Sequence, residues 1–154
     1  MITEHAYWMD RDSLYRLEWT ELIQKNGRKT AASVNKLLAM AEADGIIRSA
    51  VTSGWRPASV NDATANAAKS SKHLLALACD IADPGRGLAA WCITHQNELA
   101  ACGLWMEDPR WTDGWVHLQI VPPASGKRVF IPNSNQPKLP ALPGQKRLPE
   151  VRVI

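Results

Sequence analysis

Phenylalanine, tyrosine and cysteine are scarce in this sequence, and long apolar runs are missing. The chain has one Phe, two Tyr and three Cys among its 154 residues. An odd number of cysteines argues against a disulfide framework, and the spacing of Cys79, Cys92 and Cys102 matches no CxxC metal site. We interpret them as small buried thiols of a reducing compartment. No run approaches the roughly 20 apolar residues of a membrane span, so we expect none.

The N-terminus also lacks the features of a secretion signal. Residues 1–12 have neither a basic start nor an apolar stretch. We therefore expect a protein made in the cytoplasm that needs outside help to reach any substrate beyond the membrane. The formal net charge of +3 would suit an anionic partner such as cell wall. No basic helix or finger spacing indicates a nucleic-acid partner, and we expect none.

Composition and length indicate one ordinary globular domain. Apolar residues make up 45% of the chain and charged residues 21%, and 154 residues suit one core. We predict a single domain over residues 1–132 that acts as a monomer. Residues 133–154 are rich in proline and are interpreted as an extended tail, either a strap or a disordered end. Tryptophan is abundant, with seven residues, and suits either the core or the wall of a binding groove.

Hydrophobic periodicity predicts a mixture of helices and strands. A helix is expected over residues 19–44, with an interruption at Asn26–Gly27, and another over 87–101. Residues 60–72 are small and polar and predict a loop. Strands are predicted over residues 46–52, 74–81, 104–107, 115–121 and 128–131. Tight turns favour antiparallel pairing, so the expected class is α+β, with a small antiparallel sheet and flanking helices.

Two of the four histidines lie where a metal site would need them. His73 and Asp80 bound the apolar segment in SKHLLALACD, and His117 lies within GWVHLQI. Two histidines and one carboxylate, with a fourth position left to water, form a catalytic zinc arrangement. Such a zinc lowers the pKa of bound water to about 7 and polarises a carbonyl group.

The spacing of the first two ligands imposes a condition on the backbone. Positions seven apart face opposite sides of a regular strand, whereas in a helix they share a face. A shared metal therefore requires a helix or a bend just after His73. The alternative is that His73 lies on the surface and Asp80 at the end of a strand, and that the two residues bind no common metal ion. His95 lies on the apolar stripe of a predicted helix and is interpreted as a packed histidine.

Three ordered motifs over residues 51–132 resemble a known family. SKHLLALACD is similar to the SxHxxGxAxD signature of the zinc D-Ala-D-Ala carboxypeptidases and L-alanyl-D-glutamate endopeptidases, which include many phage endolysins. SGWRPASVN resembles the family's SGYRS segment, and WVH at 115–117 resembles the segment that carries the third ligand. Ala76 stands where the family usually has glycine. The matching positions are Ser53, Gly54, Arg56, Asn61, Ser71, His73, Ala78, Asp80 and His117.

This resemblance implies a fold and a set of roles. It implies the hedgehog-like fold of the D-Ala-D-Ala metallopeptidases and one zinc ion held by His73, Asp80 and His117. Arg56 would contact the substrate near the scissile bond, a task that suits a guanidinium fork, although it could instead anchor a turn. The remaining substrate-side candidates are Ser71, as a hydrogen-bonding group rather than a nucleophile, and Trp115, as a groove wall.

The general base is the position where the match to the family fails. Family members place an acid three residues before the last histidine, where this chain has Gly114, or a histidine five before it, where it has Thr112. Asp113 and Glu107 are the candidates that remain. If Glu107 lies opposite Trp115 in a hairpin, it shares a face with His117. We favour Glu107, because a strand holds a base more rigidly than a turn does. The alternative is that both are solvated acids.

The expected function is cleavage of peptidoglycan stem peptides, as a carboxypeptidase or an endopeptidase. A phage lysin would fit, either released by a holin or carried in a virion. One alternative is a zinc domain that has lost its base and binds cell wall or a phage structural partner. Another is a small structural phage protein without a metal.

Overall fold

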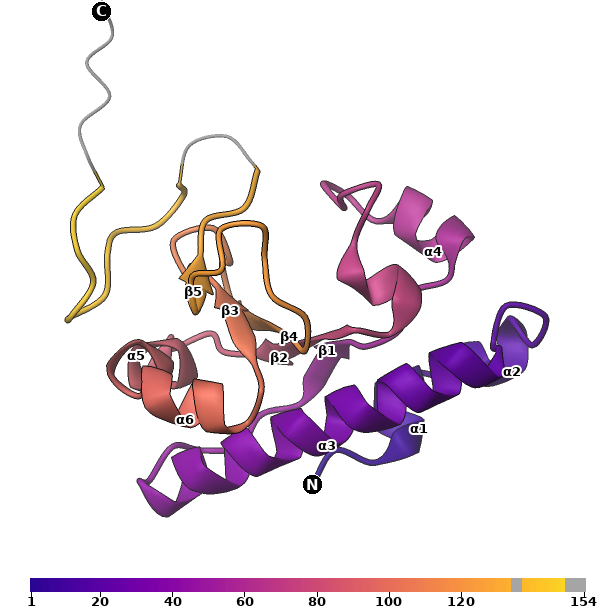
Figure 1. Cartoon of the computed structure of the whole chain (residues 1–154), viewed down its shortest axis with the longest axis horizontal. Coiled ribbons are helices and arrows are strands. Elements are labelled where there is room, and N and C mark those ends of the chain that lie inside the picture. The colour runs from indigo at the N-terminus through magenta and orange to yellow at the C-terminus, as the bar shows by residue number, and fades with distance from the viewer. Residues whose placement is uncertain (134–136, 149–154) are drawn as a thin grey trace, which may run out of the picture.

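The computed structural model describes residues 1–133 and 137–148, and Figure 1 shows the arrangement of their elements. The N-terminal half holds α1 (Glu4–Trp8), α2 (Arg11–Leu14), α3 (Glu21–Ala43), β1 (Val51–Ser53), α4 (Ala58–Ala63) and the 3₁₀-helix η1 (Lys72–Leu75). The second half holds β2 (Ala78–Ala82), α5 (Gly87–Thr94), α6 (Gln96–Ala101), β3 (Trp105–Glu107), β4 (Trp115–Gln119) and β5 (Val129–Phe130).

The five strands form one open sheet in the order β1-β2-β4-β3-β5. The pairs β1–β2, β2–β4 and β3–β4 are antiparallel, and β3–β5 is parallel. The mixed α+β class is therefore confirmed. The prediction of an antiparallel sheet was wrong for one pair, because β3 and β5 are parallel. After β4 the chain reverses and passes to the outer side of β3 rather than pairing with β4. This path makes β5 run in the same direction as β3.

The long helix α3 packs across one face of the sheet (Figure 1). Side chains alternate between the two faces of a strand. Cys79 and Ile81 of β2 and Val116 and Leu118 of β4 are all buried in the core on the α3 side. They meet the apolar face of the helix, formed by Val34, Leu37, Leu38 and Ala41. The same alternation leaves Asp80 and His117 together on the other face.

Helix α3 runs without a break through Asn26–Gly27, so the predicted interruption was wrong. A Cβ atom added at Gly27 would lie 2.2 Å from a ring carbon of Trp8. The glycine therefore allows α1 to approach closely, at a cost of about 1 kcal/mol in helix propensity. Trp8 also makes edge-to-face contacts with Trp19 and Trp55, so these three tryptophans serve the core.

Several predicted boundaries differ from the structure. Residues 60–72 do not form only a loop, because α4 extends into them as far as Ala63. The strand predicted over 74–81 begins only at Ala78. The strand predicted over 46–52 is limited to Val51–Ser53, and the helix predicted over 87–101 is divided at His95, whose φ of −120° is not helical.

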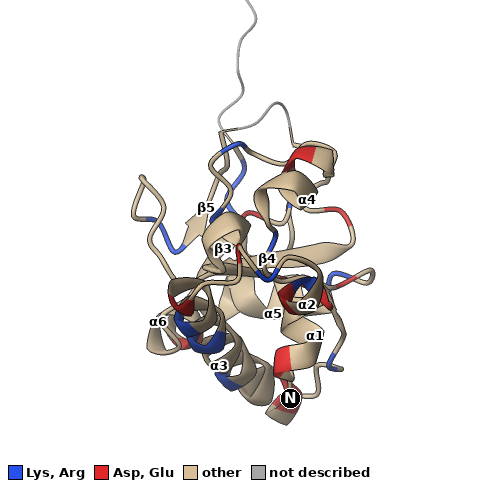
Figure 2. Ribbon diagram, turned by 90° about the vertical axis from the view of Figure 1, so that its right-hand side faces the viewer, with Lys and Arg blue, Asp and Glu red and all other residues tan. Residues whose placement is uncertain are grey.

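The described part of the tail, residues 137–148, is bonded to the body of the protein as a strap. Lys138 and Leu139 donate their amide N–H groups to the Arg110 carbonyl oxygen at 2.9 and 3.1 Å, and Arg86 donates to the Pro140 carbonyl at 3.1 Å. The remaining tail residues, 134–136 and 149–154, lie outside the described residues. In the part of the chain that is described, no helix is both long and apolar enough to cross a membrane. Figure 2 shows basic and acidic residues interspersed along the ribbon.

Candidate metal centre

A tight backbone bend separates His73 from β2. Ser71 is the N-cap of η1, and its Oγ atom accepts a hydrogen bond from the His73 amide at 3.3 Å. The 3₁₀-helix ends at Leu75, and the next residue, Ala76, adopts a left-handed conformation with φ 55°. The chain then enters β2 and brings Asp80 back toward His73. The structure thus contains the bend that the seven-residue spacing required.

Two side chains from the N-terminal helices stabilise this bend by hydrogen bonds. The Thr30 hydroxyl donates to the Ala76 carbonyl oxygen at 2.8 Å. The Tyr7 hydroxyl lies 3.0 Å from the same oxygen and 2.9 Å from the Ala78 carbonyl oxygen, and it can donate to one of them at a time. A left-handed alanine costs roughly 1–2 kcal/mol, and these buried hydrogen bonds offset that cost. The helices α1 and α3 therefore shape the site, although they carry none of its ligands.

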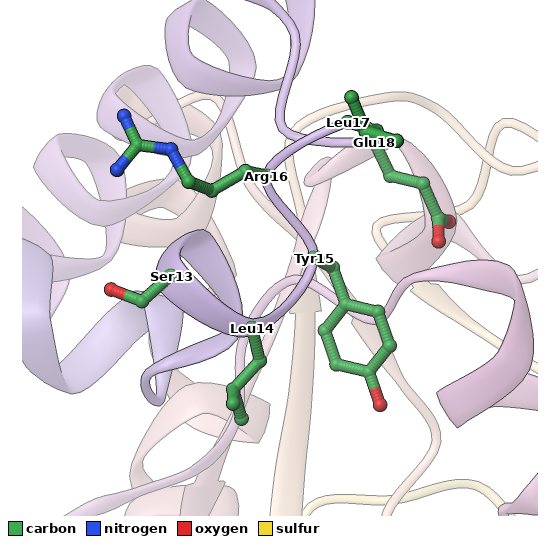
Figure 3. A pocket seen from close by; sticks show the side chains of 6 residues that line it. All are labelled: Ser13, Leu14, Tyr15, Arg16, Leu17 and Glu18. Atoms are coloured by element: carbon green, nitrogen blue, oxygen red, sulfur yellow. The ribbon is translucent and has the colours of Figure 1, made fainter.

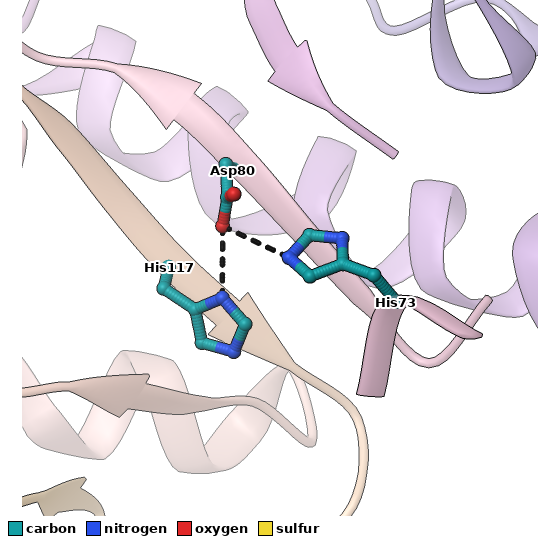
Figure 4. Close-up of side chains that lie close together, drawn as sticks. All are labelled: His73, Asp80 and His117. Carbon is teal, nitrogen blue, oxygen red and sulfur yellow. Dashed lines mark hydrogen bonds and ion pairs between the residues drawn. The ribbon is translucent and has the colours of Figure 1, made fainter. Parts of the chain in front are cut away.

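His73, Asp80 and His117 converge on one point (Figure 4). Asp80 and His117 are directly paired in the β2–β4 register. The Asp80 Oδ1 atom lies 2.8 Å from His117 Nδ1 and 3.2 Å from His73 Nε2. One ligand atom from each residue lies within 4.8 Å of the other two, and His73 is 1% exposed. The predicted ligand set is thus brought together by three separate segments.

The protonation of His73 favours a cation between these groups. Its Nδ1 atom lies 2.6 Å from the Gly54 carbonyl oxygen, which can only accept, so Nδ1 carries the hydrogen. In the neutral ring the Nε2 lone pair then faces the Asp80 carboxylate, and two acceptors oppose each other. A metal ion between them removes that repulsion. The three residues could therefore hold a metal ion through two imidazole groups and one carboxylate, which are ligand types that zinc accepts.

The electrostatics of the three residues agree with this role. Burial lowers the pKa of His73 more than Asp80 raises it, so the ring is held neutral. Burial raises the pKa of Asp80, but its contacts with the two histidines outweigh that effect and hold the pKa well below its usual range. Burial lowers the pKa of His117, and Asp80 more than reverses that effect. A metal ion would therefore compete with a proton at His117 Nδ1.

A cleft of about 780 Å³ opens over the three residues. Its lining combines charged, polar and aromatic side chains with the turns that follow α4 and β4. Besides the three candidate ligands, the side chains relevant to function are Arg56, Ser71, Glu107, Trp111, Trp115, Gln119 and Lys138. Among the tryptophans, Trp115 is 37% exposed and forms part of the open wall. Gln119 and Lys138 were not predicted, because only the folded topology places them beside the motifs.

Glu107 lies in the cleft, whereas Asp113 is exposed and does not line it. The β3–β4 register pairs Trp105 with Gln119 and Met106 with Leu118, so the next position places Glu107 opposite His117. The prediction that Glu107 lies opposite Trp115 was wrong by two residues. Glu107 and His117 nevertheless share a face of the sheet, as predicted. Burial raises the pKa of Glu107, and the negative charges of Asp80 and Asp108 add to that rise, whereas His117 opposes it.

Arg56 is buried in the cleft wall at 9% exposure. Its backbone N–H donates to the His73 carbonyl oxygen at 3.0 Å, which ties the two motifs together. Among the described residues, its Nε atom has no hydrogen-bond partner. Burial lowers the pKa of Arg56 and Asp80 opposes that effect, and a guanidinium group stays charged under such a shift.

Two other features lie apart from the candidate centre. His95 stacks on Trp91 with ring centroids 4.3 Å apart, and its Nε2 atom lies 3.7 Å from an Asp44 carboxylate oxygen. This agrees with a packed rather than a catalytic histidine. A shallow hollow near α2 is lined by residues 13–18 alone (Figure 3). One carboxylate and no histidine line it, so it offers no comparable metal site.

Comparison with protein-family models, curated proteins and solved structures finds no match to this chain. The functional assignment therefore depends on the motifs and on the geometry of the centre.

Proposed function

We propose that this protein is a zinc-dependent peptidase that cleaves the stem peptides of bacterial peptidoglycan and has the hedgehog-like fold of the D-Ala-D-Ala metallopeptidases. The convergence of His73, Asp80 and His117 at the base of an open cleft carries the proposal. The order of the three motifs along the chain supports the substrate class. Action on the cell wall, after holin-type release or from a virion, belongs to the same proposal.

The atoms that would hold one zinc ion are His73 Nε2, Asp80 Oδ1 and His117 Nδ1. Zinc in such a set supplies Lewis acidity toward a peptide carbonyl and lowers the pKa of water. The three side chains leave the cleft side open for a substrate. Asp80 and His117 lie on the face of the sheet opposite α3, so substrate entry would not disturb the core packed against that helix.

Glu107 is the residue that would move the proton. Its carboxylate shares the cleft face with His117, and burial raises its pKa toward the range in which a carboxylate can both take and return a proton. It would accept a proton from the attacking water and deliver it to the amine that leaves. Asp113 is exposed outside the cleft and is not placed for either step.

The remaining cleft residues suit an anionic peptide attached to a glycan. Arg56 presents a buried guanidinium group that can bind a carboxylate or carbonyl oxygen in two-point fashion. Lys138 from the strap adds a second positive charge to the lining. Trp111 and Trp115 supply aromatic wall area.

Digestion of muropeptides followed by mass spectrometry tests the proposal. Protein purified without a His tag and loaded with zinc should yield fragments with one defined new terminus, which also distinguishes carboxypeptidase from endopeptidase cleavage. His73→Ala should abolish the products, and His95→Ala, outside the centre, should not. Bound zinc without turnover would favour the binding-module alternative. Wild-type protein that takes up no zinc would contradict the proposal itself.

A further inference from the structure

Gln119 lies directly behind His117, away from Asp80. The two residues are two positions apart on β4, so their side chains share a face of the sheet. Gln119 is 3% exposed, and its backbone is paired with β2 on one side and β3 on the other. Its Oε1 atom lies 3.3 Å from His117 Nε2. The buried Gln119 side chain thus contacts His117 Nε2, the ring nitrogen that faces away from the candidate metal centre.

A second contact fixes the orientation of the Gln119 amide. Its Nε2 atom donates to the Val121 carbonyl oxygen at 2.7 Å. A carbonyl oxygen only accepts, so the amide nitrogen must face Val121 and the amide oxygen must face His117. The His117 Nε2 atom must then carry a hydrogen. In the neutral ring, the lone pair is consequently on Nδ1, which lies 2.8 Å from Asp80 Oδ1.

We propose that Gln119 is a positioning residue that fixes the orientation and tautomer of His117, so that Nδ1 is presented as a metal ligand. The proposal rests on the metal site proposed above. The Gly54 carbonyl does the same for His73 from the opposite side, where it selects Nε2. The two histidines would therefore bind through different ring nitrogens, each selected by an acceptor behind it. Outer acceptors of this kind typically contribute 10–100-fold to metal affinity.

A purely structural role for Gln119 is the competing explanation, since its amide also bonds the chain after β4. Three substitutions separate the two roles. Gln119→Met keeps the length but removes the acceptor. Gln119→Glu keeps an acceptor facing His117, and Gln119→Asn keeps an amide but shortens its reach. Gln96→Met, on the exposed surface of α6, is the matched control.

Zinc affinity is measured by competition with a chelator, and the ring tautomer by ¹⁵N NMR of the histidines in metal-free protein at a pH where both rings are neutral. Gln119→Met and Gln119→Asn should bind zinc about 10–100-fold more weakly than wild type. They should also lose the dominant Nε2–H form of His117. Gln119→Glu should keep the affinity within a few-fold, and Gln96→Met should change neither readout.

Unchanged affinity and an unchanged His117 tautomer in Gln119→Met would overturn this inference and leave the proposed function intact. Gln119→Asn decides the question in the same way if Gln119→Met does not fold. Wild-type protein that binds no zinc would instead overturn the proposed function, and the inference with it. Weaker zinc binding with an unchanged tautomer would count against positioning, because a general loss of structure explains it.

Discussion

At the scale of single residues, the two candidate bases differ in position, because Glu107 lines the cleft whereas Asp113 is exposed outside it. Glu107→Gln should lower kcat by at least about 100-fold, because the variant cannot take a proton from water. Zinc affinity should stay close to that of wild type, because Glu107 is not among the converging ligands. Asp113→Asn is the matched control and should leave turnover unchanged. Steady-state kinetics and a zinc titration on all three proteins check this, and activity lost only in Asp113→Asn would reverse the assignment.

A buried ion pair beside the cleft makes stability depend on pH. Asp108 accepts hydrogen bonds from the Arg110 side chain, including one from Nε at 2.9 Å, and both residues are buried. Burial raises the pKa of Asp108, but the Arg110 hydrogen bonds outweigh it and the net shift is downward. A carboxyl group with a depressed folded pKa stabilises the fold above its unfolded pKa, near 3.9 for Asp, and loses that contribution as pH falls through the folded value.

Asp108→Asn should therefore destabilise the protein by about 3–5 kcal/mol at neutral pH, since it leaves the Arg110 charge buried without its partner. The difference from wild type should begin to shrink as the pH falls below about 4, where Asp108 of the unfolded chain takes up a proton, and it should be lost as the pH falls through the lower folded pKa. Urea unfolding of both proteins at neutral and acidic pH measures this. A difference that does not change with pH would show that the charge of Asp108 is not the cause.

At the scale of elements, the bend between η1 and β2 depends on donors from α1 and α3. Thr30→Val keeps the shape of the side chain but removes the hydroxyl bonded to Ala76, and Tyr7→Phe removes the other donor. Each single change should cost roughly 1 kcal/mol, because the other donor still satisfies the carbonyl. The double variant should cost more than the sum, since the buried oxygen is then left without a donor.

Chemical unfolding of the two single variants and the double variant, with and without zinc, measures this coupling. Thr30→Ser retains the hydroxyl and serves as the control for Thr30→Val. Zinc affinity should fall along with stability in the double variant, since the bend sets the distance between His73 and Asp80. Strict additivity would mean that the two hydroxyl groups do not share the Ala76 carbonyl.

The same bend shows what could be predicted from sequence. The apolar stripe of α3 and the three residues that converge were predicted, because periodicity and motifs are local properties of the chain. The bend itself was only deduced as a requirement, because Ala76 is not a typical turn residue and its left-handed conformation depends on Tyr7 and Thr30. The parallel position of β5 and the exact partner of Glu107 were not predicted, since both depend on contacts between distant segments.

At the scale of the whole molecule, one metal ion would link the side chains of three elements of the fold. His73 lies on η1, Asp80 on β2 and His117 on β4. The unfolded chain does not keep these ligands together, so the proposed zinc ion would bind the folded state and stabilise it by mass action. The stability gained should therefore grow with the concentration of free zinc and disappear with a chelator.

At free zinc about 100-fold above the dissociation constant, the free energy of unfolding should rise by about 2.7 kcal/mol. Thermal or chemical unfolding at several buffered zinc concentrations measures the increment directly. His95→Ala should show the same increment, because that ring stacks on Trp91 outside the centre. His73→Ala should show almost none. An equal increment in His73→Ala would place the stabilising zinc elsewhere on the molecule, and the three segments would then be joined by their own packing alone.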